Sequence, residues 1–155
     1  RMLYRKSQPL NAEQQAASHF NLELVYLKRG DLDKAENQFQ AAIAADSTYA
    51  EARHNMGVVL SLRGKHLEAL EYFRAAVQLS PEYALAHKNL GNSYLVQGEY
   101  KLAEGAFRQA LVWDGKMAEA MGGLGTALIQ QGRIEEGRTA RAQAVELADI
   151  RVDRP

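Results

Sequence analysis

The chain has 155 residues, of which 46% are hydrophobic and 25% charged, a balance typical of a folded soluble protein. Its formal net charge is zero, which argues against a nucleic-acid partner, because proteins that bind phosphate backbones normally carry a strongly basic face. It contains no cysteine, which excludes disulfides and thiolate metal sites, and no apolar run long enough to predict a membrane span or a signal peptide.

Residues 1–10 are predicted to form a flexible leader, or an arm that docks on a neighbouring molecule. The segment is polar and basic, with two apolar side chains, Leu3 and Tyr4. The chain opens on Arg1 and Met2 rather than on a leading methionine, which leaves open that it is part of a longer protein. Pro9 ends any earlier helix, so the first predicted helix spans about residues 12–29.

The helices that follow are predicted as pairs joined by tight turns. Glycines recur at a constant spacing of 34 residues, at positions Gly30, Gly64, Gly98 and Gly132. A glycine on a strict period indicates a backbone position with positive φ at the end of a helix. The predicted pairs are residues 12–29 and 33–45, 49–63 and 66–79, 83–97 and 100–113, and 116–131 and 134–148. Repeated helix pairs predict a solenoid, in which each unit buries its apolar face against the next.

Columns of residues spaced 34 apart supply the expected core. An aromatic column on the second helices is expected to fill the wedge between consecutive repeats, and a glycine column on the first helices indicates close contact. A glycine inside a helix costs about 1 kcal/mol relative to alanine, so its recurrence needs a packing reason. These columns are Phe39, Phe73 and Phe107; Gly57, Gly91 and Gly125; and the alanines Ala35, Ala69 and Ala103, with Ala42, Ala76, Ala110 and Ala144.

The register resembles that of the tetratricopeptide repeat (TPR) family. The third unit matches the family signature of bulky, small and aromatic columns in Leu90, Gly91, Tyr94, Gly98, Ala103, Phe107 and Ala110. The resemblance covers about residues 16–149 and implies an all-α fold, a right-handed superhelical α-solenoid of antiparallel helix pairs. About four repeats are expected within residues 11–149, at about 16–49, 50–83, 84–117 and 118–149, followed by a tail at 150–155. Arg141 replaces the aromatic of the last repeat, so no further repeat is expected after it.

The resemblance implies that the first helix of each repeat lines a concave groove that binds a partner. Asparagines at one column can pair with the backbone of an extended peptide, because a carboxamide both donates and accepts. The alternative is that these asparagines bridge adjacent helices. The second helices, with residues such as Glu68, Glu104 and Arg108, are expected to form a solvated outer face. The expected partner-binding residues are Phe20, Asn21, Leu24, His54, Asn55, Val58, Leu62, Lys88, Asn89, Asn92 and Val96.

Asparagines alone cannot hold a ligand in such a groove. Three neutral hydrogen bonds contribute about 0.5–1.5 kcal/mol each, whereas association costs on the order of 4–15 kcal/mol. Apolar neighbours must therefore supply anchors, so the expected partner is a protein or peptide with apolar side chains, bound as an extended segment or as an amphipathic helix.

A second family template, the two-carboxylate clamp that grips acidic chaperone C-termini, is rejected. Lys88 and Asn92 match its lysine and asparagine. The next repeat, however, has Gly123 where a second asparagine is needed and Glu119 where a lysine would sit. The Glu119 carboxylate would repel the ligand's carboxylate.

No catalytic set, cofactor or metal site is predicted. The histidines His19, His54, His66 and His87 lie in different repeats or columns and have no metal-ligand spacing such as HExxH. His87 is expected on a helix surface. The sequence therefore predicts a non-catalytic protein–protein interaction scaffold without nucleic-acid binding or membrane insertion. The alternatives are a self-associating structural scaffold, hence a homo-oligomer, or the interaction module of a larger enzyme such as a TPR-bearing glycosyltransferase. The compartment is left open, with a soluble cytoplasmic protein favoured over a periplasmic or secreted one.

Overall fold

The computed structural model describes Asn11 and residues 30–152, without the side chains of the last two, so the predicted arm and the predicted helix at 12–29 lie outside it. The described chain is helical throughout, apart from turns. Its helices are α2 (Leu32–Ala45), α3 (Ala50–Leu62), α4 (His66–Leu79), α5 (Ala84–Val96), α6 (Tyr100–Trp113), α7 (Ala118–Gln130) and α8 (Ile134–Val152).

The predicted helix bounds agree with these to within two residues, with one exception at the C-terminal end. Helix α8 continues to Val152, past its predicted end at 148 and into the predicted tail. The chain after Gly137 contains neither glycine nor proline until Pro155. Because those residues are the strongest helix terminators, nothing in the sequence stops α8 where the earlier second helices stop.

Glycine turns close the helix pairs, as the spacing predicted. The φ angles of Gly64, Gly98 and Gly132 are +77°, +76° and +84°, in the left-handed region. Just after Gly98, the amide of Glu99 donates to the carbonyl of Tyr94 at 2.9 Å. That 6→1 hydrogen bond is the Schellman arrangement, which satisfies a carbonyl that the end of the helix would otherwise leave unpaired.

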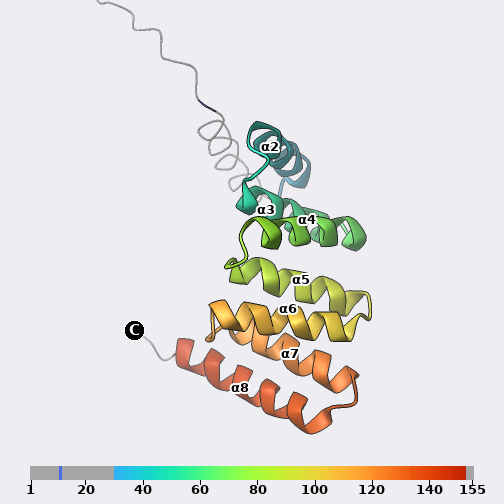
Figure 1. Ribbon diagram of the computed structural model, residues 1–155, viewed down its shortest axis with the longest axis vertical. Coiled ribbons are helices and arrows are strands. Elements are labelled where there is room, and N and C mark those ends of the chain that lie inside the picture. Colours follow the sequence, from blue (N-terminus) through green and yellow to red (C-terminus); the bar gives the residue numbers. More distant parts are fainter. Residues whose placement is uncertain (1–10, 12–29, 153–155) are drawn as a thin grey trace, which may run out of the picture.

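The helix pairs stack in chain order from α2 at one end to α8 at the other (Figure 1). The most extensive contacts are made within the pairs α3–α4, α5–α6 and α7–α8, and the second helix of each pair then packs on the first helix of the next. The protein is therefore an all-α solenoid of antiparallel helix pairs, and the predicted fold class is confirmed.

The aromatic and glycine columns meet in the core. A Cβ placed on Gly57 would lie 2.6 Å from the ring of Phe73, and one on Gly91 would lie 2.8 Å from the ring of Phe107. Phe107 also reaches the next repeat, because a Cβ on Gly123 would lie 2.4 Å from its Cζ atom. The expected aromatic wedge between repeats is thus confirmed for Phe107.

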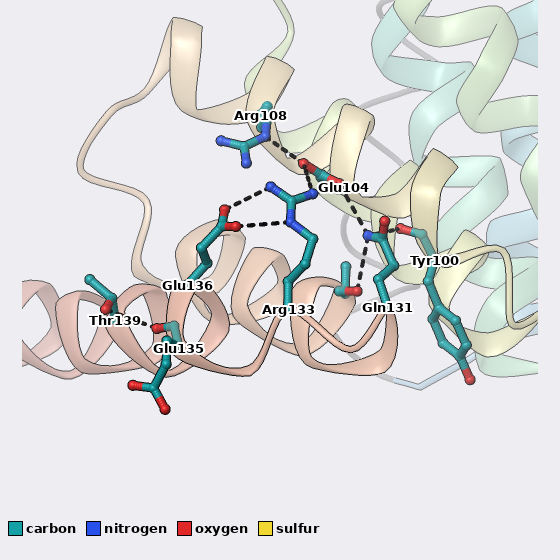
Figure 2. A network of polar contacts seen from close by, with 9 residues as sticks. Tyr100, Glu104, Arg108, Gln131, Arg133, Glu135, Glu136 and Thr139 are labelled. Atoms are coloured by element: carbon teal, nitrogen blue, oxygen red, sulfur yellow. Dashed lines mark hydrogen bonds and ion pairs between the residues drawn. The ribbon is translucent and has the colours of Figure 1, made fainter.

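A polar network joins α6 to the turn between α7 and α8 (Figure 2). Arg133 Nη1 donates to both carboxylate oxygens of Glu104, at 3.0 and 3.2 Å, and its Nη2 donates to Glu136 at 2.7 Å. Gln131 Nε2 and Arg108 Nε also donate to Glu104, at 3.1 and 3.0 Å. The expectation that Glu104 belongs to a solvated outer face is therefore wrong: its side chain is 14% exposed, because the following repeat covers it.

Candidate functional site

A groove of about 470 Å³ lies between α3 and α5, the first helices of two consecutive repeats. It contains most of the predicted partner-binding residues that the structure describes. Asn55 lies beside it on α3 and is half-buried, whereas Phe20, Asn21 and Leu24 lie outside the described residues. The lining residues are His54, Val58, Ser61, Leu62, His66, Phe73, Leu85, Lys88, Asn89, Asn92, Ser93 and Val96.

Side-chain size explains why the groove opens here and not one repeat later. Helix α5 contacts α7 more extensively than it contacts α3. Helix α7 has Gly122 and Gly123 at the columns that hold Lys88 and Asn89 in α5, so the two backbones can approach. Between α3 and α5, the longer side chains of His54 and Asn89 separate the helices and form the polar wall of the groove.

Apolar side chains exposed to solvent form the rest of the wall. Leu62 is 63% exposed and Val96 61% exposed, while Leu85 is 41% exposed. Phe73, which is buried, contributes to the lining from α4. Exposed apolar side chains gathered in one concavity are the usual mark of a binding surface.

Leu85 was missed by the sequence analysis, although a signal for it existed. Leu85, Asn89, Asn92 and Val96 follow one another at helical spacing of four, three and four residues. Side chains at that spacing share one face of a helix, so a stripe drawn from Asn89 in both directions would have included Leu85.

Lys88 is not available to bind an anionic partner. Its ammonium donates to Glu119 Oε2 at 2.6 Å, and its side chain is only 12% exposed. The sequence analysis identified Glu119 as a repulsive group for a carboxylate ligand. The structure adds that Glu119 neutralises Lys88 directly, from 31 residues further along the chain.

His54 was expected on the concave face, and it does line the groove, but as a buried part of its wall that is 3% exposed. Its Nδ1 atom lies 3.0 Å from Asn55 Oδ1 and 3.1 Å from the Tyr83 hydroxyl, and its Nε2 atom lies 2.7 Å from Asn89 Nδ2. Burial lowers the pKa of His54 to about 4; the hydrogen bond to Asn55 opposes this shift, and the charge of Lys88 adds to it. Asn89 therefore bridges two helices, as the alternative interpretation of the asparagines held.

His87 was placed wrongly by the sequence analysis. It is 9% exposed rather than on a helix surface, and its Nε2 atom lies 2.7 Å from the carbonyl oxygen of Pro81. Pro81 belongs to the turn between α4 and α5, so this contact ties that turn to the first turn of α5. The residue therefore fixes a junction between repeats and takes no part in the groove.

A second hollow, of about 780 Å³, lies between α6, α7 and α8. Its base contains Met121, Leu124 and Leu128. The charged groups on its rim are engaged within the chain, since Glu136 pairs with Arg133 and Arg108 pairs with Glu104. The lining of the α3–α5 groove is the less polar of the two in proportion, and it combines exposed apolar side chains with the amides of Asn89 and Asn92, so it is the better candidate site.

Within the described residues, no cluster of three or more histidine, aspartate or glutamate side chains is arranged to hold a metal ion. None of the helices in that part of the chain combines the length and apolarity needed to cross a bilayer.

Family models match the repeats in three overlapping segments. A tetratricopeptide repeat model matches residues 48–111, a TPR repeat model matches residues 24–64, and another tetratricopeptide repeat model matches residues 88–149. Together the three matches extend over residues 24–149. A comparison with curated proteins gives no match.

Solved structures share the fold. A crystal structure of MamA has a TM-score of 0.81 at 22% identity, over 90% of this chain and 81% of that one. MamA from Desulfovibrio magneticus RS-1, residue 41 to its end, has a TM-score of 0.78 at 25% identity, over 86% and 75%. The first TPR of Spaghetti (RPAP3), bound to the HSP90 peptide SRMEEVD, has a TM-score of 0.75 at 19% identity, over 77% and 95%. At these identities the likeness shows the fold.

Proposed function

Because the chain belongs to the tetratricopeptide repeat family, we propose that it is a non-catalytic protein-interaction module that binds an extended, uncharged peptide segment in the α3–α5 groove. The observation that carries the proposal is the group of exposed apolar side chains, Leu62, Leu85 and Val96, beside the amides of Asn89 and Asn92. The apolar side chains of a partner would pack against these three residues and so be removed from water. The backbone of the partner would form hydrogen bonds with the two asparagine amides.

An extended segment fits this wall better than a helix does. A helix satisfies its backbone hydrogen bonds internally, so it would leave the groove amides without partners. An extended chain leaves N–H and C=O groups free at every residue, which the side chains of Asn89 and Asn92 can meet. Burying two leucine-sized side chains contributes roughly 1.5–3 kcal/mol each, which is the larger part of what the groove can offer.

The charges argue for an uncharged segment rather than an acidic tail. The HSP90 peptide held by the Spaghetti (RPAP3) domain contains two consecutive glutamates and ends in aspartate. In this chain the groove lysine is already paired with Glu119 at 2.6 Å. A carboxylate arriving at Lys88 would have to displace Glu119, and the two would otherwise repel each other.

Selection from a displayed library of random peptides tests the proposal. The selected sequences should be rich in leucine, isoleucine, valine or phenylalanine and poor in aspartate and glutamate. Leu62→Glu and Val96→Glu should each abolish binding, because they place a charge in the apolar wall. Leu67→Glu is the matched control, since Leu67 is 70% exposed on α4 and lies outside the groove. Equal binding by Leu62→Glu and the unaltered protein would refute the groove as the site, and selection of acidic C-termini would refute the proposed partner chemistry.

A further inference from the structure

The ring of His54 is held in the wall of the groove by contacts with two aromatic rings and by polar contacts at both of its nitrogens. Its centroid lies 4.9 Å from that of Tyr83 and 5.7 Å from that of Phe73, with tilted planes. One ring nitrogen faces Asn55 and Tyr83, and the other faces Asn89. Because the ring is 3% exposed and packed between aromatic neighbours, these contacts decide where its proton lies.

The Asn55 contact places the proton on Nδ1. The atom facing Nδ1 is the carboxamide oxygen of Asn55, at 3.0 Å, and such an oxygen only accepts hydrogen bonds. Nδ1 must therefore donate, and the hydroxyl oxygen of Tyr83, at 3.1 Å, can accept from the same N–H. Burial keeps the imidazole neutral at pH 7 by lowering its pKa to about 4. A neutral imidazole has one N–H, so Nε2 bears a lone pair and accepts.

The orientation of the Asn89 amide follows from this tautomer. One N–H of its Nδ2 atom donates to His54 Nε2 at 2.7 Å, and this bond fixes which end of the amide faces the histidine, with the second N–H and the carbonyl oxygen, Oδ1, left over on a residue that lines the groove. Free asparagine offers donors and an acceptor alike. Held by His54, Asn89 has its acceptor, Oδ1, in one fixed position.

We propose that His54 is a positioning residue that turns the Asn89 amide, so that the groove presents a hydrogen-bond acceptor and takes a segment that supplies an N–H donor at this point. The inference rests on the proposed function, because it needs an occupant in the α3–α5 groove. It adds a specificity to that function: Asn89 Oδ1 accepts from a backbone N–H, while a carbonyl or carboxylate oxygen placed against Oδ1 itself meets its lone pairs and is repelled.

The arrangement is confined to one junction between repeats. The residues one period later, at the columns of His54 and Asn89, are Lys88 and Gly123. A lysine cannot accept a hydrogen bond and a glycine has no amide side chain. Lys88 instead pairs with Glu119. A single acceptor of this kind therefore lies in the described groove, beside the apolar anchors.

The tautomer is tested without any ligand, by NMR of the imidazole nitrogens at pH 7. His54 is expected to carry its proton on Nδ1, and a proton on Nε2 would overturn the inference. Asn89→Asp should raise the pKa of His54 by at least one unit, because a carboxylate beside Nε2 favours the imidazolium. Asn89→Leu, which has no charge, is the control and should not raise it. An unchanged pKa of His54 in Asn89→Asp would also overturn the inference.

The donor requirement is tested with a capped peptide of alternating alanine and leucine, and with its singly N-methylated forms, by NMR titration. N-methylation at the residue facing Asn89 should weaken binding about tenfold, the upper end for one neutral hydrogen bond. Equal binding by every form would overturn the inference and leave the proposed function standing. If the unmodified peptide did not bind at the highest concentration used, the proposed function itself would be contradicted and the inference would fall with it.

Discussion

The ring of Phe107 occupies the space that a side chain on Gly123 would need. A Cβ atom at Gly123 would lie 2.4 Å from Phe107 Cζ, closer than non-bonded carbon atoms approach. Gly123 stands at the column that holds Asn55 and Asn89 in the preceding repeats. The row of asparagines therefore ends at α7 for a steric reason, and the same close approach confines the groove to α3 and α5.

Gly123→Ala should destabilise the fold by about 1–3 kcal/mol, because the ring of Phe107 must move to admit the methyl group. Gly105 is the matched control: it also lies mid-helix, but nothing comes within 4 Å of a Cβ placed there. Gly105→Ala should stabilise the fold by about 0.5–1 kcal/mol through helix propensity. Urea unfolding measures both changes. If both variants changed the free energy of unfolding in the same direction, the ring of Phe107 would not be packed against Gly123.

Gly132→Ala should lower the stability by about 1–2 kcal/mol, since an L-residue with a Cβ resists φ near +84°. Crowding cannot be the cause, because the space around Gly132 is open. Gly132→Asn should lose less, as asparagine tolerates the left-handed region better than alanine. Thermal unfolding gives the ranking, and an alanine variant as stable as the asparagine variant would contradict the assigned backbone conformation.

Stability should fall on mild acidification because of His54. Its pKa is about 4 in the folded protein, against an ordinary value of 6.5, so the unfolded chain takes up the proton first. The stabilising contribution is complete above pH 6.5 and is lost as the pH falls from 6.5 towards 4. Between pH 7 and 5 the loss should be about 2 kcal/mol.

His54→Gln removes the group that titrates, so its stability should vary less over the same range. Lys88, whose charge lowers the pKa of His54, and Tyr83, which contacts its Nδ1 atom, are unchanged in this variant. Urea unfolding at pH 7, 6 and 5 measures the difference. If the two proteins had equal slopes against pH, the acid sensitivity would come from other groups.

Replacing the side chain of Gln97 with an apolar one should maintain or raise the stability of the fold. Its equivalent in the next repeat, Gln131, donates to the carboxylate of Glu104 at 3.1 Å. One period earlier, Leu70 stands in the place of Glu104, and the buried Nε2 atom of Gln97 has no protein acceptor. A buried donor without an acceptor costs about 1–3 kcal/mol. Gln97→Leu should therefore be neutral or stabilising.

Gln131→Leu is the counterpart that should lose stability, by about 1.5–3 kcal/mol, because it removes a hydrogen bond to a charged group. Denaturant titration of both variants makes the comparison. Equal losses for Gln97→Leu and Gln131→Leu would show that Gln97 has a partner of its own.

The sequence was sufficient to predict the fold because its signals are local and repeated. The turn glycines, the aromatic column and the alanine columns each recur at one spacing, so helix bounds and packing partners follow from the register. The surroundings of His54 did not follow from it. They depend on Tyr83 and Asn89, which lie 29 and 35 residues away, and the equivalent residues in other repeats differ. A column assigns a residue to a face of a helix, but it does not say which neighbour covers that face.

The partner of Lys88 escaped prediction for the same reason. Glu119 belongs to the next repeat, at a column whose earlier members are Glu51 and Leu85. Lys88 and Glu119 stand at different columns of the 34-residue repeat, so the repeat pattern does not pair them. Pairings of that kind arise from the side chains that happen to face each other once the repeats are stacked.

The ion pair of Lys88 and Glu119 also determines how the groove responds to ionic strength. A site that neutralises its own lysine attracts few counterions and releases few when it is filled, so affinity for the alternating alanine–leucine peptide should be the same in dilute and concentrated sodium chloride. Glu119→Gln would leave the ammonium uncompensated. The groove would then gain a preference for anionic segments, and that affinity would decline as salt is added.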